Sequence, residues 1–206
     1  MIAILDYGAG NLRSVETAFK RLGVTTSVTK DPDVISLADG VVLPGVGAFA
    51  DAMNALHASG LVPVIHEVIQ TGMPFLGICL GMQALFDSSD EGPGVAGLGI
   101  VPGMVHRLPD RGLKIPHIGW NSLQLHQPKS PLVRDLPDTP YAYFVHSFAC
   151  MSDNPAHVLT TTEYGVSFHS AVQKDNVIGM QFHPEKSGKI GEILLRNFVK
   201  MCRGES

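Results

Sequence analysis

The sequence predicts an α/β protein with an open, mostly parallel sheet, helices on both faces and an antiparallel section in the C-terminal half. Short apolar runs alternate with helix-like segments through the first half, which is typical of parallel strands joined by helices. The second half holds mainly strand-like runs with few helical stretches between them. The length of 206 residues suits one domain, and we expect it to span residues 1–206.

The first half of the chain carries the parallel part of the predicted sheet. Runs that are apolar, or rich in Val and Thr, predict strands at residues 2–5, 24–29, 40–43 and 75–78. Apolar residues at helical spacing predict helices at residues 12–22, 48–57, 62–70 and 80–86. Because strands and helices alternate, the strands are expected to pair in parallel.

The second half of the chain carries the antiparallel part. Strand-like runs occupy residues 100–107, 115–118, 122–125, 141–146, 158–162, 168–173 and 177–182. An amphipathic helix is predicted over residues 189–202, where apolar residues recur at helical spacing. No internal repeat or linker divides the chain.

Charge, cysteine content and hydropathy restrict the class of protein. The formal net charge is −4 and basic residues do not cluster, so nothing favours nucleic acid or an anionic membrane as a partner. The cysteines at 79, 150 and 202 are odd in number and widely spaced, which argues against a disulfide framework. No apolar run could span a bilayer, and the N-terminus reads as a strand rather than a signal peptide. We expect a soluble, cytoplasmic protein with reduced thiols.

The histidines do not indicate a metal site. There are 9 of them, yet none forms an HxxxH pair and no CxxC segment is present. The sequence therefore predicts neither a metal nor another cofactor.

Cys79 lies in the segment Gly77-Ile78-Cys79-Leu80-Gly81, between a predicted strand and a predicted helix. This is the nucleophile-elbow pattern with a thiol in place of the serine hydroxyl. Such a turn strains its central residue, and its flanking positions need glycine because strand and helix crowd each other. A thiol at a helix N-terminus is favoured as the thiolate. The alternative interpretation is a buried core cysteine beside a glycine-rich turn.

His183 and Glu185 provide candidate partners for this nucleophile. His183 follows the predicted strand at 177–182, and residues i and i+2 of an extended chain point to one side. The carboxylate of Glu185 could then hold one imidazole nitrogen, leaving the other to take the thiol proton. We predict Cys79 as nucleophile, His183 as base and later acid, and Glu185 as the residue that orients His183. The alternative is that His-Pro-Glu is an ordinary loop.

Acyl chemistry also needs donors for the developing oxyanion. The elbow supplies the backbone N–H of Leu80, and the loop Gly45-Val46-Gly47 is the best candidate for a second donor. Gln83 lies one helical turn beyond Cys79 and could reach a polar substrate, or could be a surface residue. His146 is the rival general base, but no acidic residue is near it in sequence, so we predict a structural or substrate-facing role.

The elbow around Cys79, the loop Gly45-Val46-Gly47 and the segment His183-Pro184-Glu185 together resemble the triad (class I) glutamine amidotransferases, which have a flavodoxin-like fold. Several further segments narrow the resemblance to the glutaminase subunits of imidazole glycerol phosphate synthases, and it covers most of the chain. The segments that narrow it are Pro44-Gly45-Val46-Gly47, His117-Ile118-Gly119-Trp120-Asn121 and Tyr143-Phe144-Val145-His146-Ser147. The match also includes Asp6-Tyr7-Gly8-Ala9-Gly10-Asn11-Leu12, Pro116, Phe148 and Thr161-Thr162-Glu163-Tyr164.

The resemblance implies a reaction and a partner. Cys79 would attack the side-chain amide of glutamine to give a glutamyl thioester and ammonia, and water would release glutamate. The ammonia would pass to a cyclase subunit with a β/α-barrel fold, as a heterodimer, for the synthesis of imidazole glycerol phosphate and an aminoimidazole carboxamide ribotide in histidine biosynthesis.

The resemblance also implies roles for individual residues. Val46, Gly47 and Leu80 would form the oxyanion hole, and the glutamine would be held by Gly45, Gln83, Glu91, His146, Ser147 and Phe148. The residues at or near the partner interface would be Asn11, Trp120, Tyr143 and Lys186.

Two further expectations follow. The Gly45–Val46 peptide is expected to flip, so that its donor is misdirected until the partner binds its substrate. The alternatives to the predicted function are a glutaminase subunit of a different synthase, a thiol protease, and a non-catalytic regulatory subunit, which would require a broken triad.

Overall fold

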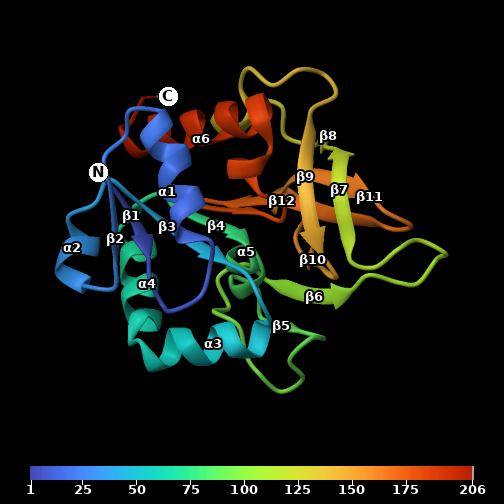
Figure 1. The fold of residues 1–206 in the computed structure, drawn as a ribbon, viewed down its shortest axis with the longest axis horizontal. Coiled ribbons are helices and arrows are strands. Elements are labelled where there is room, and N and C mark those ends of the chain that lie inside the picture. The colour runs from blue at the N-terminus through green and yellow to red at the C-terminus, as the bar shows by residue number, and fades with distance from the viewer. Residues whose placement is uncertain (206) are drawn as a thin grey trace.

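The computed structural model describes residues 1–205, so the last residue of the predicted domain 1–206 lies outside the described part. One sheet of eight strands organises the fold (Figure 1). Its strands, in spatial order, are β2 (Thr26–Thr29), β1 (Ile2–Leu5), β3 (Gly40–Gly45), β4 (Phe75–Cys79), β13 (Val177–Met180), β12 (Ser167–Lys174), β11 (Val158–Glu163) and β8 (Gln124–Leu125). The first five pair in parallel and the last three continue the sheet antiparallel, which confirms the predicted fold class.

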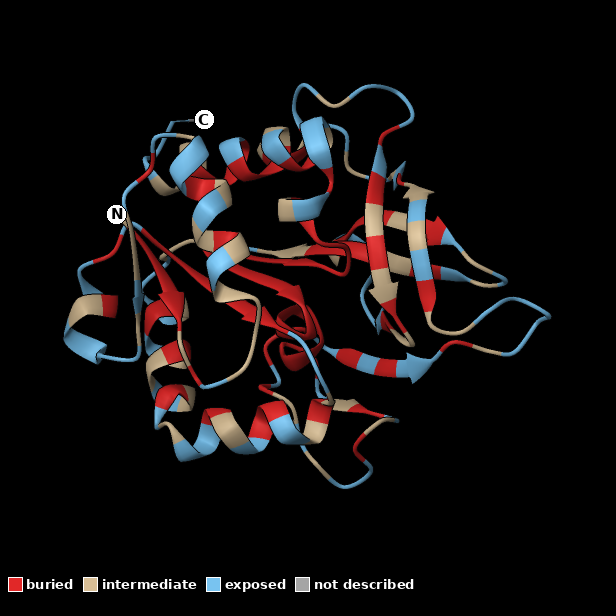
Figure 2. Ribbon diagram, in the orientation of Figure 1, coloured by how far each residue is buried: buried red, intermediate tan, exposed pale blue. Residues whose placement is uncertain are grey.

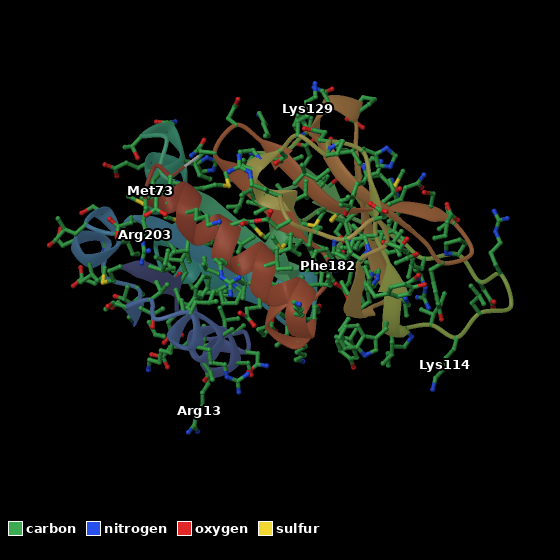
Figure 3. The ribbon with its side chains drawn as sticks, turned by 90° about the horizontal axis from the view of Figure 1, so that it is seen from above. Arg13, Met73, Lys114, Lys129, Phe182 and Arg203 are labelled. Atoms are coloured by element: carbon green, nitrogen blue, oxygen red, sulfur yellow. The ribbon has the colours of Figure 1, made fainter. Side chains whose placement is uncertain are left out.

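Helices cover both faces of the parallel part. On one face α1 (Leu12–Arg21) and α6 (Gly188–Cys202) pack over the sheet, and on the other face lie α3 (Phe49–Ala58) and α4 (Leu61–Gln70) (Figure 1). A short helix, α2 (Pro32–Ser36), follows β2. In Figure 3 α6 runs across the sheet from the side of Phe182 to Arg203.

Strand residues alternate between two hydrophobic cores. Ala3 and Leu5 of β1 join the core under α3 and α4, whereas Ile2 and Ile4 join the core under α1 and α6. The central strands β1, β3 and β4 are buried along their whole length (Figure 2). Burial on both faces explains why these strands read as continuous apolar runs rather than as alternating ones.

Two small sheets flank the main one. One contains β5 (Ser88–Ser89), β6 (Gly103–Arg107) and β10 (Phe148–Ser152), and the other pairs β7 (His117–Ser122) with β9 (Tyr141–His146). Three 3₁₀ turns complete the described residues: η1 (Pro131–Val133), η2 (Pro155–His157) and η3 (Pro184–Lys186). The loop that carries Lys114 projects at the end of the molecule opposite Arg203 (Figure 3).

The structure corrects several predicted elements. The predicted helix 80–86 is α5 (Leu80–Ala84), because the carbonyl of Leu85 accepts hydrogen bonds from Ile100 and Val101 instead of continuing the helix. The predicted strand 100–107 begins only at Gly103, whose φ of +132° interrupts the extended chain. The two strands predicted at 115–118 and 122–125 are β7 and the short β8. Strands β5 and β10 and helix α2 were not predicted.

Candidate active site

Three neighbouring parallel strands bring the predicted catalytic segments together. Gly45 at the end of β3 lies in register with Cys79 at the end of β4. On the other side of β4, Met180 of β13 pairs with Ile78, so the chain continues past the sulfur toward His183. Ligands of open α/β sheets bind at the carboxyl ends of the strands, and this edge of the sheet is such a position.

The elbow has the strain that its sequence predicts. Cys79 has a φ of +54°, which is uncommon for a residue with a side chain. A Cβ on Gly77 would lie 2.6 Å from the carbonyl oxygen of Gly81, and a Cβ on Gly81 would lie 1.8 Å from that of Leu43. Both glycines are therefore required by the close approach of α5 to strands β3 and β4, and the turn holds Cys79 at the helix start.

His183 and Glu185 form a buried pair. The Nδ1 atom of His183 lies 2.8 Å from Oε1 of Glu185, and the two side chains are 3% and 1% exposed. The other imidazole nitrogen, Nε2, is buried and has no hydrogen-bond partner within residues 1–205. Glu185 thus occupies one nitrogen of the ring and leaves the second available on the side of the pocket that contains Cys79.

The electrostatics of this pair favour a charged imidazole. Burial lowers the pKa of His183, but the neighbouring Cys79 sulfur and the Glu185 carboxylate together outweigh burial and raise the pKa to about 9. His183 therefore carries its proton at neutral pH when both partners are ionised.

A pocket of about 280 Å³ opens over the sulfur. Its walls include every residue predicted for the oxyanion hole and for substrate binding except Gly45, which lies beneath them at the end of β3. The lining residues are Val46, Gly47, Cys79, Leu80, Gln83, Glu91, Pro116, Val145, His146, Ser147, Phe148 and His183. The structure thus brings together residues from six separate segments of the sequence.

Several polar groups in the pocket wall are already bound within the protein. The Nε2 atom of Gln83 donates to the carbonyl of Phe148 at 3.0 Å and to Oε1 of Gln181 at 3.1 Å. Oε2 of Glu91 accepts from the backbone N–H of Phe49, the first residue of α3, at 2.8 Å. Gln83 therefore presents its Oε1 oxygen to a ligand, and Glu91 retains its other carboxylate oxygen.

The loop Gly45-Val46-Gly47 begins in register with Cys79 and lines the pocket that contains the sulfur. A Cβ on Gly45 would lie 2.8 Å from the hydroxyl of Tyr7 and 2.9 Å from the backbone nitrogen of Gly81, so only glycine fits. Gly47 has a φ of +101°. The side chain of Val46 is 45% exposed, which leaves the loop open to solvent on its outer side.

Sequence reasoning missed two residues beside the sulfur. Tyr7, 6% exposed, donates from its hydroxyl to the carbonyl of Pro44 at 3.0 Å, and its pKa is raised by burial and by Cys79. Gln181, fully buried, donates from Nε2 to Sγ of Cys79 at 3.8 Å. Gln181 lies just beyond the end of β13 at Met180, and its local sequence carries no signal for contact with the sulfur.

The four residues predicted for a partner interface lie around η3. The rings of Trp120 and Tyr143 are 6.1 Å apart, and Nζ of Lys186 is 6.0 Å from the Tyr143 ring. Asn11 lines a surface groove together with Glu185. Trp120 is 56% exposed, so this cluster presents an aromatic surface to solvent next to the buried His183–Glu185 pair.

Comparison with known proteins places this geometry in a family. The model of the family "Glutamine amidotransferase class-I" matches residues 3–202. The chain belongs to this family. The imidazole glycerol phosphate synthase subunit HisH of Moorella thermoacetica is 51% identical over 202 residues, which cover 98% of this chain and 95% of that protein. The protein of the same name from Methanothermobacter thermautotrophicus is 49% identical over 203 residues, covering 98% of this chain and all of that protein.

Solved structures agree with a class-I glutamine amidotransferase fold. A crystal structure described as a glutamine amidotransferase has a TM-score of 0.76 at 18% identity and covers 98% of both chains. The structure of PurLQS from Thermotoga maritima gives a TM-score of 0.74 at 18% identity over 97% of both chains. Residues 1–205 of this amidotransferase contain no helix long and apolar enough to cross a membrane, and no cluster of three metal-ligating side chains.

Proposed function

We propose that this class-I glutamine amidotransferase hydrolyses glutamine to glutamate and ammonia through a thioester on Cys79. The observation that carries the proposal is the strained elbow cysteine in a pocket whose wall contains the unpartnered Nε2 of His183. Glu185 supports this assignment, since it fixes the ring through Nδ1. The imidazole glycerol phosphate synthase subunits at 46–51% identity support glutamine as the substrate.

The first half of the reaction forms the thioester. With the proton on His183, the Cys79 thiolate attacks the side-chain amide carbon of glutamine. The carbonyl oxygen takes up negative charge and accepts hydrogen bonds from the backbone N–H of Leu80 and from the Val46–Gly47 loop. His183 then gives its Nε2 proton to the departing nitrogen, so that the C–N bond breaks and ammonia leaves. Glu185 stabilises the imidazolium until this transfer.

The second half releases glutamate. His183, now neutral, takes a proton from a water molecule as the water attacks the thioester carbon. The C–S bond breaks, glutamate departs as the acid, and the thiolate–imidazolium pair is restored. The α-amino group of glutamine suits the Oε1 of Gln83 and the free oxygen of Glu91, and the backbone of Ser147 and Phe148 lines the pocket beside Gln83.

We further propose that the ammonia passes to a cyclase subunit with a β/α-barrel fold, as a heterodimer that forms imidazole glycerol phosphate synthase. The names of the most similar relatives support this partner. The exposed apolar side chains of the β7–β9 sheet support a docking face, since Ile118, Trp120 and Tyr141 are 53%, 56% and 51% exposed. Asn11, Tyr143 and Lys186 would extend that face. All three cysteines are free, which is compatible with the proposed cytoplasmic location.

The loop Gly45-Val46-Gly47 offers a means of control by the partner. We propose that the Gly45–Val46 peptide flips, so that its N–H reaches the oxyanion only when the partner is loaded with substrate. The exposed Val46 side chain and the positive φ of Gly47 are compatible with such a change. Equal glutaminase activity in the isolated chain and in the loaded complex would contradict this part.

The decisive test of the function is glutamate release by the parent and by Cys79→Ser, each with and without the cyclase and its nucleotide. We expect the substitution to abolish release in both states. A glutamine-analogue electrophile should label Cys79 and leave Cys150 and Cys202 unmodified, because Cys150 is buried and Cys202 lies outside the pocket. Activity that survives Cys79→Ser would remove Cys79 as the nucleophile.

A further inference from the structure

The side-chain amide of Gln181 lies between two sulfur atoms. Its Nε2 is 3.8 Å from Sγ of Cys79, and its Oε1 is 3.9 Å from Sγ of Cys150. The side chain is fully buried, so no solvent competes for these contacts. Rotating the amide by 180° would exchange its ends and turn the carbonyl oxygen toward Cys79. The environment of Cys79 therefore depends on what fixes this amide.

Gln83 fixes it. The Nε2 of Gln83 uses its two N–H groups on the carbonyl of Phe148 and on Oε1 of Gln181, at 3.0 and 3.1 Å. A rotated Gln83 would bring its own oxygen against the carbonyl of Phe148, which can only accept. Gln83 must therefore present N–H groups to both partners, so Gln181 must present its oxygen to Gln83 and its N–H to Cys79.

A pair of neutral histidines fixes the far end of this chain of hydrogen bonds. Nδ1 of His146 lies 2.9 Å from the carbonyl of Phe148 and must donate to it. In a neutral ring Nε2 is then an acceptor, and it receives the N–H of His117 Nδ1 at 3.0 Å. Burial lowers the pKa of His146 to about 3 and that of His117 to about 4, so both rings stay neutral near pH 7. Nε2 of His117 in turn faces the amide nitrogen of Asn121 at 3.4 Å.

We propose that Gln181 is a positioning residue for the nucleophile. Its N–H donates to the sulfur of Cys79, stabilises the thiolate relative to the thiol, and directs the free lone pairs toward the pocket. Gln83, Phe148 and the His146–His117 pair hold the amide in this orientation. The inference rests on the proposed function only in taking Cys79 as the nucleophile. A side chain that merely fills space at this position would not change the ionisation of the sulfur.

The test is the reactivity of the Cys79 thiol against pH in the full chain, without glutamine. The rate of modification by methyl methanethiosulfonate is followed at the Cys79 peptide by mass spectrometry. Gln181→Met keeps the bulk of the side chain and removes the N–H donor. We expect the midpoint of the profile to rise by about one pH unit and the rate below the midpoint to fall about tenfold. The titratable groups that also face this sulfur or its pocket are Tyr7, Glu91, His146, Cys150, His183 and, through His183, Glu185.

Gln173→Met is the matched control. Gln173 lies on the adjacent strand β12 and bonds to Ser130 and Asp175, outside the chain of hydrogen bonds that ends at Cys79. We expect the parent profile from this control. An unchanged midpoint in folded Gln181→Met would overturn the proposal.

If Gln181→Met does not fold, the variant Gln83→Met tests the proposal instead. This substitution frees the Gln181 amide to rotate, and we expect a smaller shift of the midpoint in the same direction. A Cys79 reactivity midpoint in Gln83→Met that equals the midpoint of the parent would then overturn the proposal. Glutamate release by Cys79→Ser tests the function separately, so a failure of the positioning role and a failure of the proposed function give different results.

Discussion

Replacing Glu185 by Gln should lower the pKa of His183 without removing its hydrogen bond. Both side chains are buried, and Nδ1 and Oε1 lie 2.8 Å apart, so water screens the pair little. In the parent, burial opposes protonation of His183, and Cys79 and Glu185 together raise its pKa to about 9. Glutamine keeps an acceptor for the Nδ1 proton but removes the negative charge, which leaves Cys79 as the remaining anionic neighbour.

The size of the effect follows from the strength of a charge-assisted hydrogen bond. Such a bond contributes about 1.5–3 kcal/mol, and one pKa unit corresponds to ~1.4 kcal/mol. The pKa of His183 should therefore fall by about one to two units, to roughly 7–8. The pKa of His183 is about 9 in the folded protein and about 6.5 in the unfolded chain, so protonation of His183 favours the fold. This stabilisation is complete below about pH 6.5 and is lost as the pH rises through about 9. The variant should lose ~2 kcal/mol of unfolding free energy near pH 6, and the difference should shrink toward pH 10.

The assay is NMR titration of the imidazole nitrogens, with the His183 signals assigned by their absence from His183→Asn. Urea unfolding at pH 6 and pH 9.5 measures the matching change in stability. Glu192→Gln serves as the control, because Glu192 bonds to Arg196 on the exposed face of α6. Identical His183 midpoints in the parent and in folded Glu185→Gln would refute the argument that Glu185 maintains the imidazolium.

Three further outcomes are expected. Gly81→Ala should lower the melting temperature in calorimetry by about 6–12 °C, equivalent to ~3 kcal/mol, because the new Cβ would lie 1.8 Å from the carbonyl oxygen of Leu43. The pKa of His117 is about 4 in the folded protein and about 6.5 in the unfolded chain, so His117 makes the parent protein lose unfolding free energy as the pH falls from 7 to 5. His117→Phe should make this loss ~2 kcal/mol smaller in urea unfolding at the two pH values. Trp120→Ser should weaken cyclase binding by about 30-fold in calorimetric titration, whereas Leu37→Ser, at a separate exposed apolar residue, should leave it unchanged.

The sequence was most informative where local chemistry fixes the structure. The elbow was predictable because glycine at 77 and 81 has a steric reason that depends only on the strand-to-helix turn. The contact between His183 and Glu185 was predicted, but the predicted reason was wrong, because Glu185 lies in the 3₁₀ turn η3 beyond the end of β13 at Met180 and not in an extended chain. The parallel half of the sheet was predictable because its strands are buried on both faces and read as apolar runs.

What the sequence did not reveal depends on contacts between distant segments. Strand β10 was missed because it exists through pairing with β6, whose partner residues lie 41 to 49 positions earlier in the chain, and not through its own pattern. Gln181 and Tyr7 were missed because neither has a local signal for contact with Cys79. The roles of Gln83 and His146 are likewise set by Phe148 and His117, which only the folded chain places beside them.

The same contacts favour one of the two candidate general bases. His146 lines the pocket, but its Nδ1 donates to Phe148 and its Nε2 accepts from His117, so neither nitrogen is open to a thiol proton. Burial, together with the neighbouring His117 and His183, also opposes protonation of this ring and lowers its pKa to about 3. His183 has the opposite environment, with a carboxylate on one nitrogen and an unpartnered second nitrogen within the described residues. Two imidazoles in one pocket are thus driven to opposite charge states, which suits His183 to proton transfer and His146 to holding the wall of the site.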